Sequence, residues 1–173
     1  MNIKKLGNSV LIFTIRRLIE IIGVFVLCLG ILLFIALISY NPTDPNFIFP
    51  EYTEINNILG FRGSYTSDLF IQSFGFIAFL IPVTYIFTGC NIFKKKEIFL
   101  LIENTFFIIL YSLFGSFFFS FYYNDSLTLY INGNGGFVGS YLNESFLKNI
   151  ISSYEDIFYY FFIILIISLF LIS

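Results

Sequence analysis

The stretch RRLIEIIGVFVLCLGILLFIALISYNPTDPNF, residues 16–47, decides the fold. It begins with a basic pair, runs apolar from Ile21 to Ile38, and stops at a turn that contains Pro42 and Pro45. A helix of about twenty residues rises about 30 Å, which is the thickness of the hydrocarbon core of a bilayer. The stretch therefore predicts a membrane span with a basic anchor before it and an abrupt exit after it.

The composition of the 173-residue chain is that of a membrane protein. Hydrophobic residues make up 58% of it, and the mean hydropathy is +0.89. Charged residues make up 12%, against roughly 25% in soluble domains. Histidine is absent, which removes His-based nucleophilic triads and the commonest metal ligand. Cys28 and Cys90 lie within apolar runs, which favours packing between helices over a disulfide framework. We expect no catalytic, cofactor-binding or metal-binding residue.

Further apolar runs predict an all-α integral membrane protein with four transmembrane helices. A basic segment, 1–18, precedes the membrane domain, 19–173. The spans are expected at about 19–40, 69–93, 98–122 and 157–172, with outer loops 41–68 and 123–156 between them. The last run is short for a span. Pro82 is expected to kink the second span, and Ser67 or Asp68 to cap its start.

The basic residues are segregated along the chain. Most of the nine lie before the first span or between the second and third, whereas the two longer loops are acidic. Because basic residues in short loops mark the cytoplasmic side, both termini are expected to be cytoplasmic. The run of lysines after the second span could also recruit anionic lipid, but we favour a role in topology. The expected topology anchors are Arg16, Arg17, Lys94, Lys95 and Lys96.

Small residues predict where the helices pack. Ser112, Ser116 and Ser120 recur at every fourth position of the third span, with Gly115 beside them. Gly23 and Gly30 form a similar pair on the first span. In lipid, small residues let helix backbones approach closely, so we interpret both sets as helix-packing positions.

Ionisable residues are absent from the middle of the predicted spans. Glu20 and Glu103 fall within the first turns of their helices, and Gln72 and Asn104 do not form a convincing relay. A pore or transporter normally carries ionisable groups deep in the membrane. A small channel or transporter subunit is therefore the alternative function, and a membrane enzyme ranks below it.

The second outer loop is glycine-rich over residues 132–140. It lacks the spacing of a dinucleotide site and the Lys-Ser/Thr of a P-loop, so it does not predict a nucleotide site. The apolar positions that follow recur at helical spacing: Val138, Tyr141, Leu142, Phe146 and Ile150. They predict a short amphipathic helix in or near the outer interface, and packing against the outside of the bundle stays open as the other interpretation.

Five blocks of the chain resemble, in order, the four-helix membrane region at the N-terminus of FtsK/SpoIIIE-type DNA translocases. They are RLIEIIG from Arg17, ALISYNPTDP from Ala36, NILGFRGSYTSDL from Asn57, FGFIAFLIP from Phe74 and GGFVG from Gly135. Ser64 stands where the family usually has alanine. The motif residues are Ser39, Tyr40, Asn41, Pro42, Asp44, Pro45, Gly60, Gly63, Asp68, Gly135, Gly136 and Gly139.

The resemblance implies a membrane anchor and assembly module of a cell-division DNA translocase in the bacterial cytoplasmic membrane. The family's pattern implies septum targeting, a role in chromosome segregation, contacts with other division-machinery membrane proteins, and a hexamer set by a downstream ATPase motor. The 173 residues contain no Walker motif and no basic DNA-binding domain, so we expect neither enzymatic activity nor direct nucleic-acid binding. Because the chain stops with the last span, we expect a truncated product, a split gene or an excised region.

Overall fold

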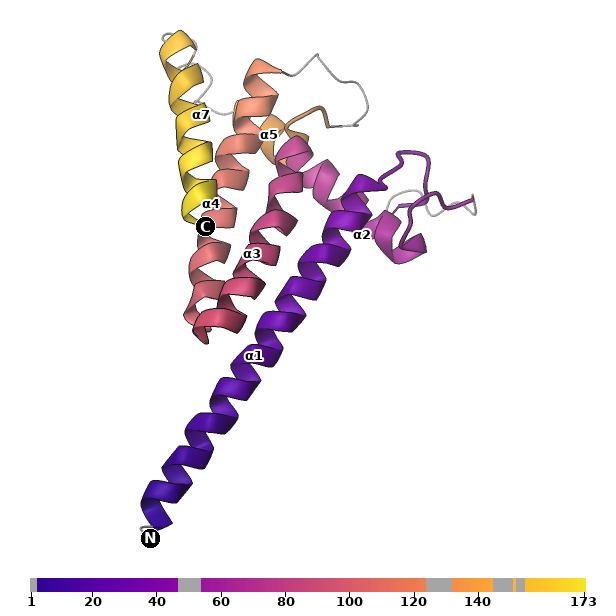
Figure 1. The fold of residues 1–173 in the computed structure, drawn as a ribbon. Helices are drawn as coiled ribbons and strands as arrows, with labels where there is room; N and C mark the ends of the chain where they lie inside the picture. Colours follow the sequence, from indigo (N-terminus) through magenta and orange to yellow (C-terminus); the bar gives the residue numbers. More distant parts are fainter. Residues whose placement is uncertain (1–2, 47–53, 124–131, 145–150, 152–154) are drawn as a thin grey trace.

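The computed structural model describes residues 3–46, 54–123, 132–144, 151 and 155–173, and within them every regular element is a helix (Figure 1). Four helical stretches are long and apolar enough to cross a membrane: Val10–Ile38, Gly60–Lys95, Phe99–Tyr122 and Glu155–Ile172. The predicted all-α architecture with four membrane-capable helices is therefore confirmed. The cytoplasmic placement of both termini stays a prediction.

Helix α1 is a single unbroken helix, Ile3–Ile38. No break separates the predicted N-terminal segment from the first span, because residues 10–18 contain no glycine or proline that would interrupt the helix. Its first turns extend past the ends of α3 and α4 (Figure 1), and the side chains of residues 10–18 are exposed. The helix ends before Asn41-Pro42, since a residue that precedes proline is disfavoured in the helical region.

The second span is divided into three elements: α2, Gly60–Phe74; η1, Gly75–Phe79; and α3, Leu80–Lys95. Helix α2 starts at Gly60, well before the predicted start at 69, so residues 60–68 are not loop. The expected cap was wrong: Ser67 and Asp68 lie inside α2 and are buried. The expected kink at Pro82 was also wrong in position. The break falls at Gly75, whereas Pro82 sits in the first turn of α3, where proline is tolerated.

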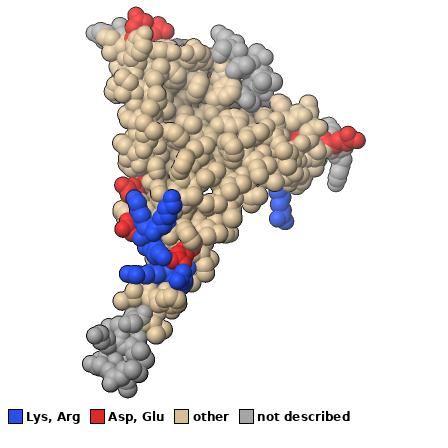
Figure 2. Space-filling model, in the orientation of Figure 1, with Lys and Arg blue, Asp and Glu red and all other residues tan. Residues whose placement is uncertain are grey.

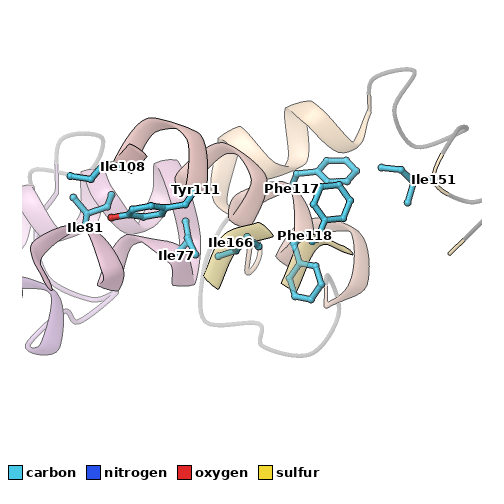
Figure 3. Packing of buried hydrophobic residues seen from close by; sticks show 9 residues of the cluster. Ile77, Ile81, Ile108, Tyr111, Phe117, Phe118, Ile151 and Ile166 are labelled. Carbon is cyan, nitrogen blue, oxygen red and sulfur yellow. The ribbon is translucent and has the colours of Figure 1, made fainter. Parts of the chain in front are cut away.

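The remaining helices are α4, Phe99–Tyr122; α5, Gly136–Asn143; and α7, Glu155–Ile172. Helix α4 is central, because α3, α5 and α7 all pack against it (Figure 1). The apolar core lies along this helix and is rich in aromatic rings. Figure 3 shows its members Ile77, Ile81, Ile108, Tyr111, Phe117, Phe118, Ile151 and Ile166.

Helix α1 packs chiefly against α3, and glycine makes this contact possible. A Cβ atom on Gly23 would lie 2.8 Å from the backbone nitrogen of Phe93, and one on Gly30 would lie 2.9 Å from that of Ile86. From the other side, a Cβ on Gly89 would lie 2.5 Å from the nitrogen of Leu27. The two backbones are thus as close as small residues allow, which maximises dispersion contacts in lipid.

A line of hydroxyl and amide groups joins α3, α4 and the end of α7. The Asn104 Nδ2 donates to Thr88 Oγ1 at 2.7 Å, and the hydroxyls of Thr84 and Tyr111 lie 3.1 Å apart. Ser173 Oγ lies 3.3 Å from Thr84 Oγ1. Helix α7 therefore ends beside Thr84, about ten residues, or about 15 Å, along α3 from its lysines.

Candidate functional site

The motif residues of the first outer loop meet where α1 ends and α2 begins, a region we call the outer junction (Ser39–Pro45, Asn57, Gly63, Ser64, Ser67 and Asp68). Asp44 is 5% exposed and accepts three hydrogen bonds. Its Oδ1 binds the backbone nitrogen and the Nδ2 of Asn56 at 2.9 and 3.0 Å, and its Oδ2 binds the nitrogen of Asn57 at 2.8 Å. A carboxylate saturated in this way fixes the loop backbone.

Asn57 is the residue on which the two sides of the junction converge. Its Nδ2 donates to the carbonyl oxygens of Ala36 and Ser39, at 2.9 and 3.2 Å. Both carbonyls belong to the last turn of α1 or its exit, where a helix leaves oxygens without internal partners. The Asn57 Oδ1 accepts from the nitrogen of Leu59 at 3.1 Å, and the Asn57 carbonyl accepts from Gly60. One side chain therefore ties the end of α1 to the turn that starts α2.

Gly63 and Ser64 complete the junction from α2. A Cβ on Gly63 would overlap Oδ1 of Asn57, so only glycine leaves room for that amide. Ser64 is buried, and its hydroxyl donates to the carbonyl of Pro45 at 2.6 Å. An alanine at this position could not make this bond. Ser64 therefore adds a polar contact between the exit turn and α2.

Tyr40 and Asp68 extend the junction toward the second outer loop. The Tyr40 hydroxyl donates to Asp68 Oδ1 at 3.2 Å and accepts from Gln72 Nε2 at 3.3 Å. The backbone carbonyl and Oε1 of Gln72 accept from Asn132 Nδ2 at 3.3 and 3.4 Å. Polar residues of α2 thus contact both outer loops.

The glycine-rich segment inserts against α2, η1 and α4, in a contact that we call the glycine clamp (Gly75, Gly135, Gly136 and Gly139). The Phe76 nitrogen donates to the carbonyl of Asn134 at 3.0 Å, and a Cβ on Gly75 would overlap that carbonyl. Gly75 and Gly136 both have φ near +65°, a region that other residues rarely adopt. In this contact the backbone of the glycine-rich segment therefore packs directly against the backbone around Gly75, without side chains between them.

The clamp rests on the serine stripe of α4. A Cβ on Gly135 or on Gly139 would overlap the carbonyl of Ser116, whose hydroxyl donates to the carbonyl of Phe74 at 3.0 Å. The structure buries every predicted packing position: Gly23, Gly30, Ser112, Gly115, Ser116 and Ser120. It also shows the partners that the sequence did not reveal, namely Gly89 for α1 and the glycine clamp for Ser116 and Ser120.

Helix α5 differs from the amphipathic helix expected here. Its buried face is made of Gly136 and Gly139, whereas Phe137 and Tyr141 are 61% and 68% exposed. The helix packs against α4 and α2, one of the two placements that the sequence left open. Its predicted continuation through Phe146 and Ile150 lies outside the described residues, so an interfacial helix there stays a prediction.

The expected topology anchors gather at the opposite end of the bundle. Glu20 of α1 is 8% exposed and pairs with Arg17, at 2.6 Å, and with Lys96, which ends α3 in the left-handed conformation. Arg16, Lys94 and Lys95 are exposed there. Figure 2 shows these basic side chains grouped on one part of the surface. Their role in topology stays a prediction, but their common position is what that role requires.

The described side chains at these sites make structural contacts between helices and loops. No cluster of metal-binding side chains occurs in the part of the chain that the structure describes. The buried carboxylates of Asp44 and Asp68 are engaged by backbone amides, side-chain amides and a phenol. Asn57 is the functional candidate missing from the motif residues singled out from the sequence. The available signal was its position three residues before Gly60 and six before Gly63.

Comparison with known proteins identifies the family to which the chain is similar. The family model described as the 4TM region of DNA translocase FtsK/SpoIIIE matches residues 15–173. Proteins named DNA translocase FtsK are similar to part of the chain. That of Rickettsia typhi is 39% identical over 70 residues, which cover 39% of this chain and 9% of the relative. That of Azospirillum brasilense is 31% identical over 88 residues, which cover 50% of this chain and 14% of the relative.

The matched region is a small part of these relatives. The Shewanella oneidensis protein, also named DNA translocase FtsK, is 30% identical over 95 residues, which cover 53% of this chain and 10% of the relative. The chain thus aligns with roughly a tenth of the length of such proteins. No solved structure matches the chain.

Proposed function

Because the chain belongs to the four-transmembrane region of the FtsK/SpoIIIE DNA translocase family, we propose that it is a membrane anchor and assembly module of a bacterial cell-division DNA translocase. In this role it lies in the cytoplasmic (inner) membrane at the division septum and supports chromosome segregation. The outer junction carries the proposal, since its motif residues join helices to one another and do not surround a reaction centre.

The proposed module has neither ATPase activity nor nucleic-acid contacts of its own. The carboxylates that could serve as acid or base, Asp44 and Asp68, are engaged in structural hydrogen bonds. Motor and DNA-binding functions would belong to other parts of a translocase. The proposed partners are the lipid bilayer, other membrane proteins of the division machinery, and further copies of the chain in a hexamer.

A small channel or transporter subunit is the second candidate, and the polar line through Asn104, Thr88, Thr84 and Tyr111 favours it. These groups are amides and hydroxyls. The buried carboxylates of the described residues, Glu20 among them, lie at the two ends of the bundle. Ion or solute flux through liposomes that contain the purified chain would support a channel, and tight liposomes would exclude it.

Localisation in dividing cells tests the anchor proposal. A fluorescent protein should be fused before α1, because α1 begins at the basic end of the bundle and extends past the ends of α3 and α4 (Figure 1). Fluorescence is divided by that of a membrane dye, because the septum holds two apposed membranes. Midcell enrichment above the dye, absent from a fusion to an unrelated four-span protein, is expected. A uniform rim would refute septal targeting by this region.

A further inference from the structure

A groove of about 750 Å³ lies between α1 and the helices that follow it. Phe25, Leu29 and Leu32 of α1 form one wall, α2 contributes Arg62 and Thr66, and Tyr85 of α3 contributes to the other side. Pockets that bind small ligands have volumes of about 300–1,000 Å³, so the groove has the size of a binding site. Its α1 wall lies within the membrane-capable stretch Val10–Ile38.

Arg62 is the one charged residue among the described residues that line the groove. It is exposed, and the ion pairs of the described chain all involve Glu20 at the far end of the bundle. Figure 2 shows a basic group beside α2, well separated from the other basic side chains. An arginine near the end of a membrane helix places its charge at the level of the headgroups, where this guanidinium is available to bind an anion.

The α1 wall of the groove does not have the surface of a helix–helix contact. Membrane helices associate through small residues: on α1, Gly23 and Gly30 already face α3, and Ala36, at the groove, is buried. The groove wall carries large side chains that stay accessible: Phe25, Leu29 and Leu32 are 62%, 49% and 47% exposed. Such a wall suits acyl chains better than another helix backbone.

We propose that this groove is a binding site for an anionic phospholipid. An acyl chain lies along Leu29 and Leu32, and the phosphate is held by Arg62 at the rim. A guanidinium can bind phosphate through two parallel N–H···O bonds, which gives the site a preference for an accessible anionic headgroup. The lipid belongs to the leaflet on the side of α2, and it fills the space that α1 leaves as it diverges from α4.

Fluorescence quenching tests the proposal directly, because the chain has no tryptophan. L29W places one tryptophan in the groove, and I164W places one on an exposed site of α7, 68% exposed, as the matched control. Each protein is reconstituted in phosphatidylcholine vesicles that contain a small fraction of phosphatidylglycerol with brominated acyl chains. We expect about fivefold enrichment of the quencher at position 29 over position 164, the factor that one cation–lipid contact gives.

Substitution of Arg62 then distinguishes specific binding of the anionic lipid from non-specific contact with the surrounding bilayer. In the L29W background, R62Q should remove the enrichment, and R62K should retain part of it, because lysine keeps the charge without the planar fork. Equal quenching at positions 29 and 164 would overturn the proposal. A tryptophan at 29 that no brominated lipid quenches would also overturn it, since a protein segment such as a second copy would then occupy the groove.

Native mass spectrometry of the unsubstituted chain gives an independent measurement. Protein released from mixed phosphatidylcholine–phosphatidylglycerol nanodiscs should retain one phosphatidylglycerol molecule more often than one phosphatidylcholine. The R62Q variant should lose this preference, and R16Q, which removes an exposed cation remote from the groove, should keep it. Equal retention of the two lipids by the unsubstituted chain would overturn the proposal.

Discussion

Replacement of Asn57 by alanine gives the most direct test of the outer junction. The substitution removes bonds that Nδ2 donates to the carbonyls of Ala36 and Ser39 and, at 3.4 Å, to Ser67 Oγ, and one bond accepted from the nitrogen of Leu59. Asn57 is 4% exposed, so water does not replace these partners while the junction stays closed. At about 1 kcal/mol for each hydrogen bond, and less for the long bond to Ser67, the free energy of unfolding should fall by about 3–4 kcal/mol.

Equilibrium unfolding in mixed micelles with increasing dodecyl sulfate, followed by far-UV circular dichroism, measures this loss. N56A is the matched control, because its side chain makes one bond, to Asp44 Oδ1 at 3.0 Å, in a part-buried position. The control should lose about 1 kcal/mol or less. If N57A lost no more free energy than N56A, Asn57 would not be the residue that joins α1 to α2.

Three further substitutions test the other contacts. G139L should displace α5 from α4, because the side chain would overlap the carbonyl of Ser116, and amide hydrogen exchange in α5 should rise by about tenfold or more. G89L should separate α1 from α3 and lower the free energy of unfolding by about 1–3 kcal/mol, as overpacking does. E20Q should remove the ion pairs with Arg17 and Lys96, so that the melting temperature falls and depends less on salt concentration.

Each of these changes has a matched control on an exposed site. F137L changes α5 on its exposed side and should leave amide hydrogen exchange in α5 unchanged. F87L changes an exposed side chain of α3 and should leave the free energy of unfolding unchanged. E103Q removes an exposed carboxylate for which the structure gives no ion pair among the described residues. Equal effects in a variant and its control would show that the proposed contact does not contribute.

Hydropathy predicted the number of membrane-capable helices, because an apolar run of about twenty residues is long enough to cross the hydrocarbon core as a helix. Hydropathy placed the start of the second membrane-capable helix at about residue 69, whereas the helix starts at Gly60. Residues 60–68 carry glycine, serine, threonine and aspartate, which favour turns over helix interiors. The helix forms there because Gly63, Ser64, Ser67 and Asp68 are buried against the loop and the end of α1. In residues 60–68, tertiary contacts therefore stabilise a helix although the local sequence favours a turn. Hydropathy alone does not distinguish such a helix from a loop.

The sequence motifs marked the residues of the site but not their partners. Helical spacing placed Ser112, Ser116 and Ser120 on one face of α4, since that depends on one helix alone. The contact of this face with Gly135 and Gly139 depends on how a distant loop folds back, which a single sequence does not encode as a periodicity. The same holds for Gly89 opposite Gly23. Asn57 opens the block that contains Gly60 and Gly63, but that spacing did not reveal its hydrogen bonds to the carbonyls of Ala36 and Ser39, which lie about twenty residues earlier in the chain.

The bundle is joined in series, and the order matters for the proposed function. Helix α7 packs chiefly on α4, α4 meets α3 and α5, and α1 contacts α3 and α2. In the proposed translocase the motor would follow α7, so a force on it would reach α1 through α4 and its neighbours, and through the contact of Ser173 with Thr84 of α3. Two routes then lead onward: the glycine contacts between α3 and α1, and the glycine clamp with the outer junction. A variant such as G139L should weaken the second route without touching either end of the chain, which makes the clamp the place where anchoring and assembly can be separated.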